Sequence, residues 1–123
     1  MEGLINIIDD CELIWLSLSK ILPDYRDSFR FYNDIKEALK MMDAMKDVKN
    51  QLIIVDMELA SVDGIQKLMS MMPHHDYHII LLTSLPLSFI EKQISKLDIT
   101  RIFTKPFNIS ELANLIKVLH RKD

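Results

Sequence analysis

Glycine and cysteine are scarce in this chain, and each scarcity excludes a class of site. The 123 residues include only two glycines, Gly3 and Gly64, so neither a glycine-rich dinucleotide fingerprint nor a Walker phosphate loop can be present. The single cysteine, Cys11, can form no internal disulfide and no cysteine-based zinc site. We therefore expect a reduced, cytoplasmic protein.

Long apolar runs and an excess of basic residues are also missing. No run approaches the roughly 20 apolar residues that a membrane-spanning helix needs, and the acidic start does not resemble a signal peptide. The 15 basic and 18 acidic residues give a formal net charge of −3, whereas nucleic-acid-binding domains usually carry a basic surface. We expect neither a membrane nor a nucleic acid as a direct partner.

What the chain does contain is enough apolar material for one folded core. Hydrophobic residues make up 49% of the sequence and charged residues 27%, which is typical of a globular protein. At this length, we expect a single domain covering residues 1–123.

Short apolar runs alternate with longer segments of helical periodicity. Strands are predicted at residues 4–8, 28–32, 52–55, 77–82 and 99–103. Helices are predicted at residues 11–22, 33–45 with Asn33 as the cap, 63–72, 86–97 and 108–119. Because the central runs are apolar at consecutive positions, they suit strands buried on both faces of a parallel sheet. The pattern predicts an α/β fold, a doubly wound five-stranded parallel sheet flanked by five helices.

Polar side chains end four of the predicted strands. Asp9 and Asp10 follow the first, Asp56 the third, Thr83 the fourth and Lys105 the fifth. In a parallel sheet these residues meet at one edge, where such folds bind ligands. Three close carboxylates repel one another, and a hard cation such as Mg²⁺ removes the conflict. The lysine and the hydroxyl suit phosphate oxygens, so the pattern predicts phosphoryl transfer to a carboxylate.

Four stretches of the sequence, in this order and spacing, resemble the CheY-like receiver domain of bacterial two-component response regulators. They are residues 7–10, 53–57 with Asp63-Gly64 behind them, 81–84 and 103–107. The resemblance covers essentially the whole chain and implies the flavodoxin-like strand order 2-1-3-4-5. It implies a phosphorylation-controlled signalling switch, not an enzyme in the usual sense, with intrinsic phosphoryl-transfer and autodephosphorylation chemistry.

The resemblance assigns the phosphoryl chemistry to three residues. Asp56 would be the phosphoacceptor, Thr83 would hydrogen-bond the phosphoryl group, and Lys105 would pair with it, with a cis peptide bond between Lys105 and Pro106. The donor would be a phosphohistidine on a sensor histidine kinase or a histidine phosphotransfer protein. A downstream effector would bind the face formed by the fourth helix, the fifth strand and the fifth helix.

The resemblance also implies a Mg²⁺ site. Asp10 would bind the metal directly, Asp9 would help partly through water, and Asp56 and the backbone carbonyl of Glu58 would complete the protein ligands.

The sequence departs from the family pattern at several positions. Cys11 stands where a third acidic residue is common, Ala60 where proline is frequent and Asp98 where glycine is common. The largest departure is Ile102, three residues before Lys105, where the family carries a tyrosine or phenylalanine that swings inward on activation. Two alternatives therefore stay open: a pseudo-receiver that binds partners without phosphate and, third in order, a phosphatase with Asp56 as nucleophile.

The helix at residues 11–22 carries a candidate docking surface. If Ile14, Leu18 and Ile21 face the core, Trp15 and Leu16 turn toward solvent, where large apolar side chains can mark a contact surface. The resemblance places this helix where receivers dock on their phosphodonor. The alternative is a tryptophan that lies partly covered along its own helix.

Three histidines at 74, 75 and 78 look at first like a metal cluster. They enter the predicted fourth strand at the end opposite to the acidic residues. We interpret them as part of a solvated loop.

Overall fold

Strands and helices alternate along the chain as the sequence predicts. The computed structural model describes residues 3–72 and 77–120. Within these residues the strands are β1 (Ile5–Ile8), β2 (Phe29–Tyr32), β3 (Gln51–Asp56), β4 (Tyr77–Thr83) and β5 (Arg101–Thr104). The α-helices are α1 (Glu12–Ile21), α2 (Ile35–Ala44), α3 (Met57–Met71), α4 (Leu87–Ile94) and α5 (Ile109–Leu119), with one unpredicted 3₁₀ helix, η1 (Pro23–Ser28).

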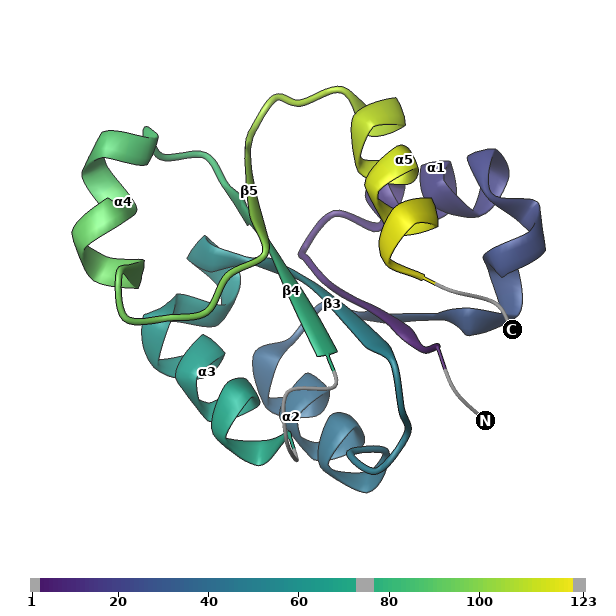
Figure 1. Ribbon diagram of the computed structural model, residues 1–123, viewed down its shortest axis with the longest axis horizontal. Helices are drawn as coiled ribbons and strands as arrows, with labels where there is room; N and C mark the ends of the chain where they lie inside the picture. Colours follow the sequence, from purple (N-terminus) through teal and green to yellow (C-terminus); the bar gives the residue numbers. More distant parts are fainter. Residues whose placement is uncertain (1–2, 73–76, 121–123) are drawn as a thin grey trace.

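The five strands form one parallel sheet in the order β2-β1-β3-β4-β5. In its centre, Ile8 of β1 lies opposite Val55 of β3, and Val55 lies opposite Leu81 of β4. Helices α1 and α5 cover one face of the sheet, and α2, α3 and α4 lie on the other side (Figure 1). The predicted doubly wound, flavodoxin-like fold is confirmed.

Two apolar cores sandwich the sheet because successive side chains of a strand point to opposite faces. In β3, Ile53 and Val55 pack in the core beneath α2, α3 and α4, whereas Leu52 and Ile54 pack in the core beneath α1 and α5. All of β3 is buried, which explains its unbroken apolar run. Burial of each such side chain stabilises the fold by about 1.5–3 kcal/mol.

The predicted core face of α1 is wrong at one residue. Leu18 is fully buried, but Ile21 is 42% exposed, and Leu22, the residue that ends the helix, is buried in its place. Positions four apart lie on the same side of a helix, so Leu18 and Leu22 share the core-facing side. Trp15 is half-buried and not turned fully to solvent, because its ring stacks on Phe31 with centroids 5.5 Å apart.

Two helix starts also differ from the prediction. Helix α2 is capped by Asp34, not Asn33, and the Asp34 carboxylate accepts a hydrogen bond from the N–H of Lys36 at 2.9 Å. Helix α3 begins at Met57 instead of residue 63, and it is interrupted at Ser61, whose backbone has φ 65° and ψ 164°. The helical path resumes beyond this kink, close to the predicted start.

No helix in the described part of the chain combines the length and the apolar character needed to cross a membrane.

Candidate functional site

The polar residues predicted to meet at the strand ends do converge. Asp9 follows β1, Asp56 ends β3, Thr83 ends β4 and Lys105 lies just after β5. Asp9, Asp56 and Thr83 are buried, whereas Asp10 is exposed. The parallel strand order produces this meeting, because each strand delivers its carboxyl end to the same edge of the sheet.

The ammonium group of Lys105 lies between two carboxylates. Its Nζ donates hydrogen bonds to Oδ2 of Asp56 at 2.7 Å and to Oδ2 of Asp9 at 3.0 Å. Burial alone would lower the pKa of Lys105, but these two bonds and the two negative charges outweigh it and raise the pKa above its ordinary value. The lysine is therefore firmly cationic at neutral pH.

Asp9 is the most deeply buried member of the acidic group. Burial raises its pKa above the ordinary value, although the N–H of Cys11, which donates to Asp9 Oδ1 at 2.7 Å, and Lys105 oppose the effect. Carboxylate oxygens of Asp9, Asp10 and Asp56 lie within 4.8 Å of one another. Three carboxylates against one ammonium leave an excess of negative charge, and this all-oxygen donor set fits a hard divalent cation.

The two carboxylate oxygens of Asp56 have different partners. Oδ1 accepts hydrogen bonds from the N–H groups of Glu58 at 2.8 Å and Leu59 at 3.2 Å, so Asp56 caps α3. Oδ2 faces Lys105. Because the cap bonds fix the side chain, Asp56 presents its carboxylate in one orientation at the rim of the sheet.

Glu58 makes a contact that the sequence did not predict. Its Oε2 accepts a hydrogen bond from the Thr83 hydroxyl at 3.0 Å, and its Oε1 accepts one from the backbone N–H of Ser84. Thr83 Oγ1 in turn accepts a bond from the N–H of Leu85 at 3.1 Å. The family resemblance implies a role for the backbone carbonyl of Glu58 only. The one sequence signal for a side-chain role is its position two residues after Asp56, which ends a strand.

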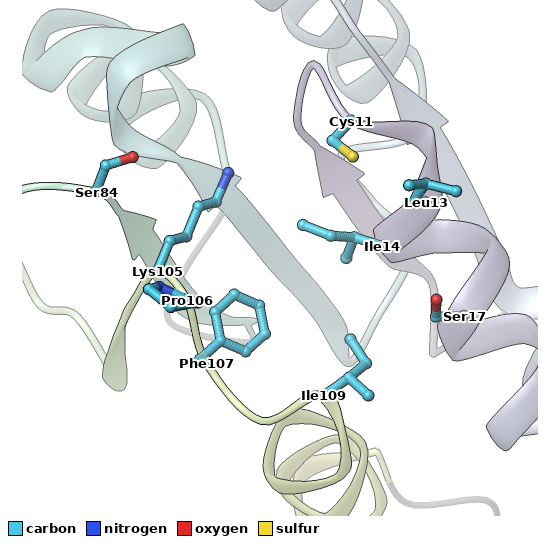
Figure 2. Close-up of a pocket in the computed structure, with 9 residues that line it drawn as sticks. All are labelled: Cys11, Leu13, Ile14, Ser17, Ser84, Lys105, Pro106, Phe107 and Ile109. Carbon is cyan, nitrogen blue, oxygen red and sulfur yellow. The ribbon is translucent and has the colours of Figure 1, made fainter.

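An open apolar pocket of about 480 Å³ adjoins Lys105, between α1 and the connection from β5 to α5. Figure 2 shows Ile14 of α1 facing Phe107 across it, with the side chain of Lys105 at its margin. The residues that line the pocket are Cys11, Leu13, Ile14, Ser17, Ser84, Lys105, Pro106, Phe107 and Ile109.

Trp15 and Leu16 do not line this pocket. They border a separate groove with Ser19, Lys20 and Arg26, and Leu16 is 48% exposed. The two predicted docking residues therefore lie on a different flank of α1 from the residues that line the pocket beside Lys105.

The other singled-out positions lie as follows. The Lys105–Pro106 peptide bond is cis, as the resemblance implied. Ile102 is half-buried, pairs with Leu81 in the sheet and packs into the core beneath α2, α3 and α4. Ala60 is buried and Asp98 is exposed.

The histidine cluster is described only in part. His78 is exposed, and its Nδ1 lies 3.2 Å from the hydroxyl of Thr100. His74 and His75 lie outside the described residues.

Comparisons with known proteins agree with this geometry. Among solved structures, a response regulator from Thermotoga maritima matches with a TM-score of 0.74 and 18% identity over 97% of this chain and 98% of that one. A response regulator receiver domain protein from Clostridium thermocellum matches with a TM-score of 0.75 and 18% identity, over 95% and 93% of the two chains.

A response regulator protein from Burkholderia pseudomallei, described with a phosphorylated aspartic acid, a calcium ion and citrate, matches with a TM-score of 0.70 and 23% identity over 95% and 72% of the chains. No curated protein matches the chain. The model of the response regulator receiver domain matches residues 5–117. The chain therefore belongs to the response regulator receiver domain family of two-component systems.

Proposed function

We propose that this receiver is a phosphorylation-controlled signalling switch in which Asp56 accepts a phosphoryl group from a phosphohistidine. The observation that carries the proposal is the position of Lys105, whose ammonium bonds both Asp56 and Asp9 at the rim of the sheet. A fixed cation beside the accepting carboxylate can neutralise charge on a transferring phosphoryl group. We propose one such domain over residues 1–123.

Mg²⁺ is the cofactor we propose. Asp9, Asp10 and Asp56 would bind it through carboxylate oxygens and Glu58 through its backbone carbonyl. The three carboxylates are close enough to share one ion, and Mg²⁺ keeps coordination positions for water and phosphate oxygens. When bound, it supplies positive charge to the phosphoryl oxygens.

In the proposed reaction, a carboxylate oxygen of Asp56 forms a new P–O bond while the P–N bond of the phosphohistidine breaks. The released imidazole takes up a proton and stays on the donor protein. This chain's part is to hold Asp56 by its cap bonds, to neutralise charge through Lys105, and to offer the Thr83 hydroxyl as a donor to the product. We propose no role for the domain as a conventional enzyme.

Intact-mass spectrometry after incubation with acetyl phosphate and Mg²⁺ tests this function. We expect a single phosphoryl adduct on the wild type and none on Asp56→Asn, whose amide oxygen can still cap α3. Asp63→Asn, at an exposed position, is the matched control and should be phosphorylated like the wild type. Absence of the adduct with both acetyl phosphate and phosphorylated histidine kinases would reject the proposal in favour of the pseudo-receiver.

The phosphodonor surface is a further part of the proposal. We propose that Trp15 and Leu16 contact the donor. The apolar pocket beside Lys105 offers a second flank of α1, which includes Leu13, 66% exposed. Leu16→Ser alters the flank that carries Trp15, and Leu13→Ser alters the flank beside Lys105, so the two variants test the two surfaces separately. The variant at the docking flank should slow transfer from a phosphorylated kinase and leave phosphorylation by acetyl phosphate unchanged.

An effector would bind the α4–β5–α5 face. Three large apolar side chains are exposed on its helices: Leu87, Phe89 and Val118. Large exposed apolar side chains can mark a contact surface. Similar structures are described as a signal receiver domain of an HD domain-containing protein from Pseudomonas fluorescens and as an adenylate cyclase from Rhodopirellula baltica, which supports control of a partner or attached domain.

A further inference from the structure

The side chain of Glu58 accepts hydrogen bonds from two donors at the edge of the acidic group. Both of its carboxylate oxygens are engaged, one by the Thr83 hydroxyl and the other by the backbone N–H of Ser84. The pair of bonds ties the first turn of α3 to the start of the loop between β4 and α4. Glu58 is itself an exposed residue, so the tie lies at the open rim and not in the core.

The same residue is bonded to the phosphoacceptor through its main chain. The N–H of Glu58 donates to Oδ1 of Asp56 at 2.8 Å, so the backbone of Glu58 holds Asp56 while its side chain holds Thr83. The backbone and the side chain of Glu58 therefore join Asp56 to Thr83, and in the proposal a group attached to Asp56 lies beside the Glu58 carboxylate. A phosphoryl group there would bring oxygens that need donors, and Lys105, Thr83 and Ser84 each carry a donor at this rim.

We propose that the Glu58 carboxylate is an internal competitor of the phosphoryl group for Thr83 and Ser84. It holds the β4–α4 loop in place without phosphate, and the phosphoryl group must displace it to bind its own partners. Glu58 is thus a positioning residue that sets how tightly the receiver holds phosphate. This inference rests on the proposed function of Asp56.

The competition follows from the number of donors. The Thr83 hydroxyl has one hydrogen and the Ser84 backbone N–H has one, so neither can serve a carboxylate and a phosphoryl oxygen fully at once. The two acceptors are also both anionic, and like charges that share the same donors repel each other. Displacing Glu58 therefore costs two charge-assisted hydrogen bonds before the phosphoryl group gains them.

The test is a titration of the full chain with beryllofluoride, a phosphoryl mimic, in saturating Mg²⁺. Four variants are compared with the wild type: Glu58→Ala, Glu58→Gln, Glu58→Asp and Glu12→Gln. Glu12 lies in the first turn of α1 and is exposed, so Glu12→Gln controls for the loss of one surface charge. Glu58→Asp keeps the charge but withdraws the carboxylate by one methylene from both donors.

We expect Glu58→Ala to bind beryllofluoride about tenfold more tightly than the wild type, the scale of one charge-assisted hydrogen bond. Glu58→Asp should bind nearly as tightly as Glu58→Ala, Glu58→Gln should be intermediate because one oxygen can still accept, and Glu12→Gln should match the wild type. In the phosphate-free protein, the Ser84 amide should exchange with solvent faster in Glu58→Ala and Glu58→Asp than in Glu12→Gln.

The failures are distinguishable. If no variant and no wild-type protein binds beryllofluoride, the proposed function of Asp56 is rejected, and with it the competition. If the wild type binds and Glu58→Ala binds no more tightly, the function stands and the competition is rejected. If Glu58→Ala gains affinity but Glu58→Asp behaves like the wild type, the effect belongs to charge alone and the competition for donors is rejected.

Discussion

Lys105 is the residue on which the charge balance of the acidic group depends. It bonds two buried carboxylates and keeps its own charge because of them. Each partner of such a pair has been removed from water, so deleting one leaves the other uncompensated. The energetic role of every residue in the group therefore depends on which charges remain around it.

Replacing Lys105 with alanine should destabilise the metal-free protein by about 2 kcal/mol, because Asp9 and Asp56 would lose the cation that they share. Added Mg²⁺ should recover most of this loss, since the ion supplies positive charge to the same oxygens. Urea denaturation with EDTA and with Mg²⁺ measures both effects. Lys67→Ala, which breaks an exposed ion pair with Asp63, should cost under about 0.5 kcal/mol in either condition.

Lys105→Ala should also weaken the coupling of phosphorylation to partner binding more than it weakens Mg²⁺ binding. The carboxylates around the metal remain in the variant, whereas the contact with the phosphoryl group is lost. Phosphorylation-dependent partner binding at the wild-type level would contradict this role.

Replacing Asp9 is expected to stabilise the metal-free protein, whereas replacing Lys105 is expected to destabilise it. Its carboxylate is fully buried, and burial raises its pKa, which means that the ionised form is held at a cost. Asp9→Asn should raise the free energy of unfolding of the metal-free protein by about 1 kcal/mol, because the amide oxygen can still accept from Cys11. The same change should weaken Mg²⁺ binding about tenfold or more. Calorimetric melting and Mg²⁺ titration measure the two effects, and a loss of stability would contradict the argument.

At the scale of single elements, α3 shows how the site is joined to the fold. Asp56 ends β3 and caps α3 at once, so the strand passes directly into the helix at the proposed phosphoacceptor. A few residues later Ser61 adopts φ 65° and ψ 164°, a region that side chains avoid. Its Oγ accepts a hydrogen bond from the N–H of Gly64 at 3.2 Å, which caps the rest of the helix.

Two substitutions at Ser61 should separate the strain from the cap. Ser61→Ala loses the cap and keeps the strain, so it should cost about 1 kcal/mol. Ser61→Gly also loses the cap but relieves a strain of about 1 kcal/mol, so its stability should stay near that of the wild type. Urea denaturation compares them, and an equal loss in both variants would show that the backbone at this position carries no strain.

Elements that are specified by a local sequence feature, such as an apolar run or a capping side chain, could be predicted from the sequence. The apolar run at residues 52–55 of β3 and the aspartate that follows it indicated a central strand and the phosphoacceptor candidate, because burial on both faces favours apolar residues at consecutive positions. Asn108 was predicted to open α5, and its side chain does accept a bond from the N–H of Ser110. Here the local chemistry and the tertiary structure agree.

Features that depend on tertiary contacts could not be predicted in this way. The side-chain bonds of Glu58 join residues 25 and 26 positions apart in the chain, and no local pattern specifies such a pairing. Trp15 is partly covered because Phe31 of the edge strand β2 happens to stack on it. The break in α3 at Ser61 is likewise not specified by the periodicity of the apolar residues around it.

At the scale of the whole molecule, the proposed switch requires that a signal from Asp56 reach the helices through the edge of the sheet. Thr83 ends β4, and its hydroxyl is already bonded toward Glu58 at the acidic group. Ile102 lies on the neighbouring strand β5, half-buried in the core beneath α2, α3 and α4. A conformational change requires contacts that differ between the two states, and few such contacts are available to a residue packed in this way.

The last prediction concerns the path of activation. Isoleucine is shorter than tyrosine or phenylalanine and stiff at χ1, so Ile102 cannot sweep the arc that an aromatic ring sweeps in the family. We expect Ile102 to keep its rotamer on addition of beryllofluoride and Mg²⁺, and the change to be carried by the loop after Thr83 and residues 85–89. Methyl NMR should show Ile102 shifting no more than Ile53, which is buried in the central strand, while the backbone amides of Leu85 and of residues 87–89 shift clearly. A large reorientation of Ile102 would show instead that β5 transmits the signal without an aromatic ring.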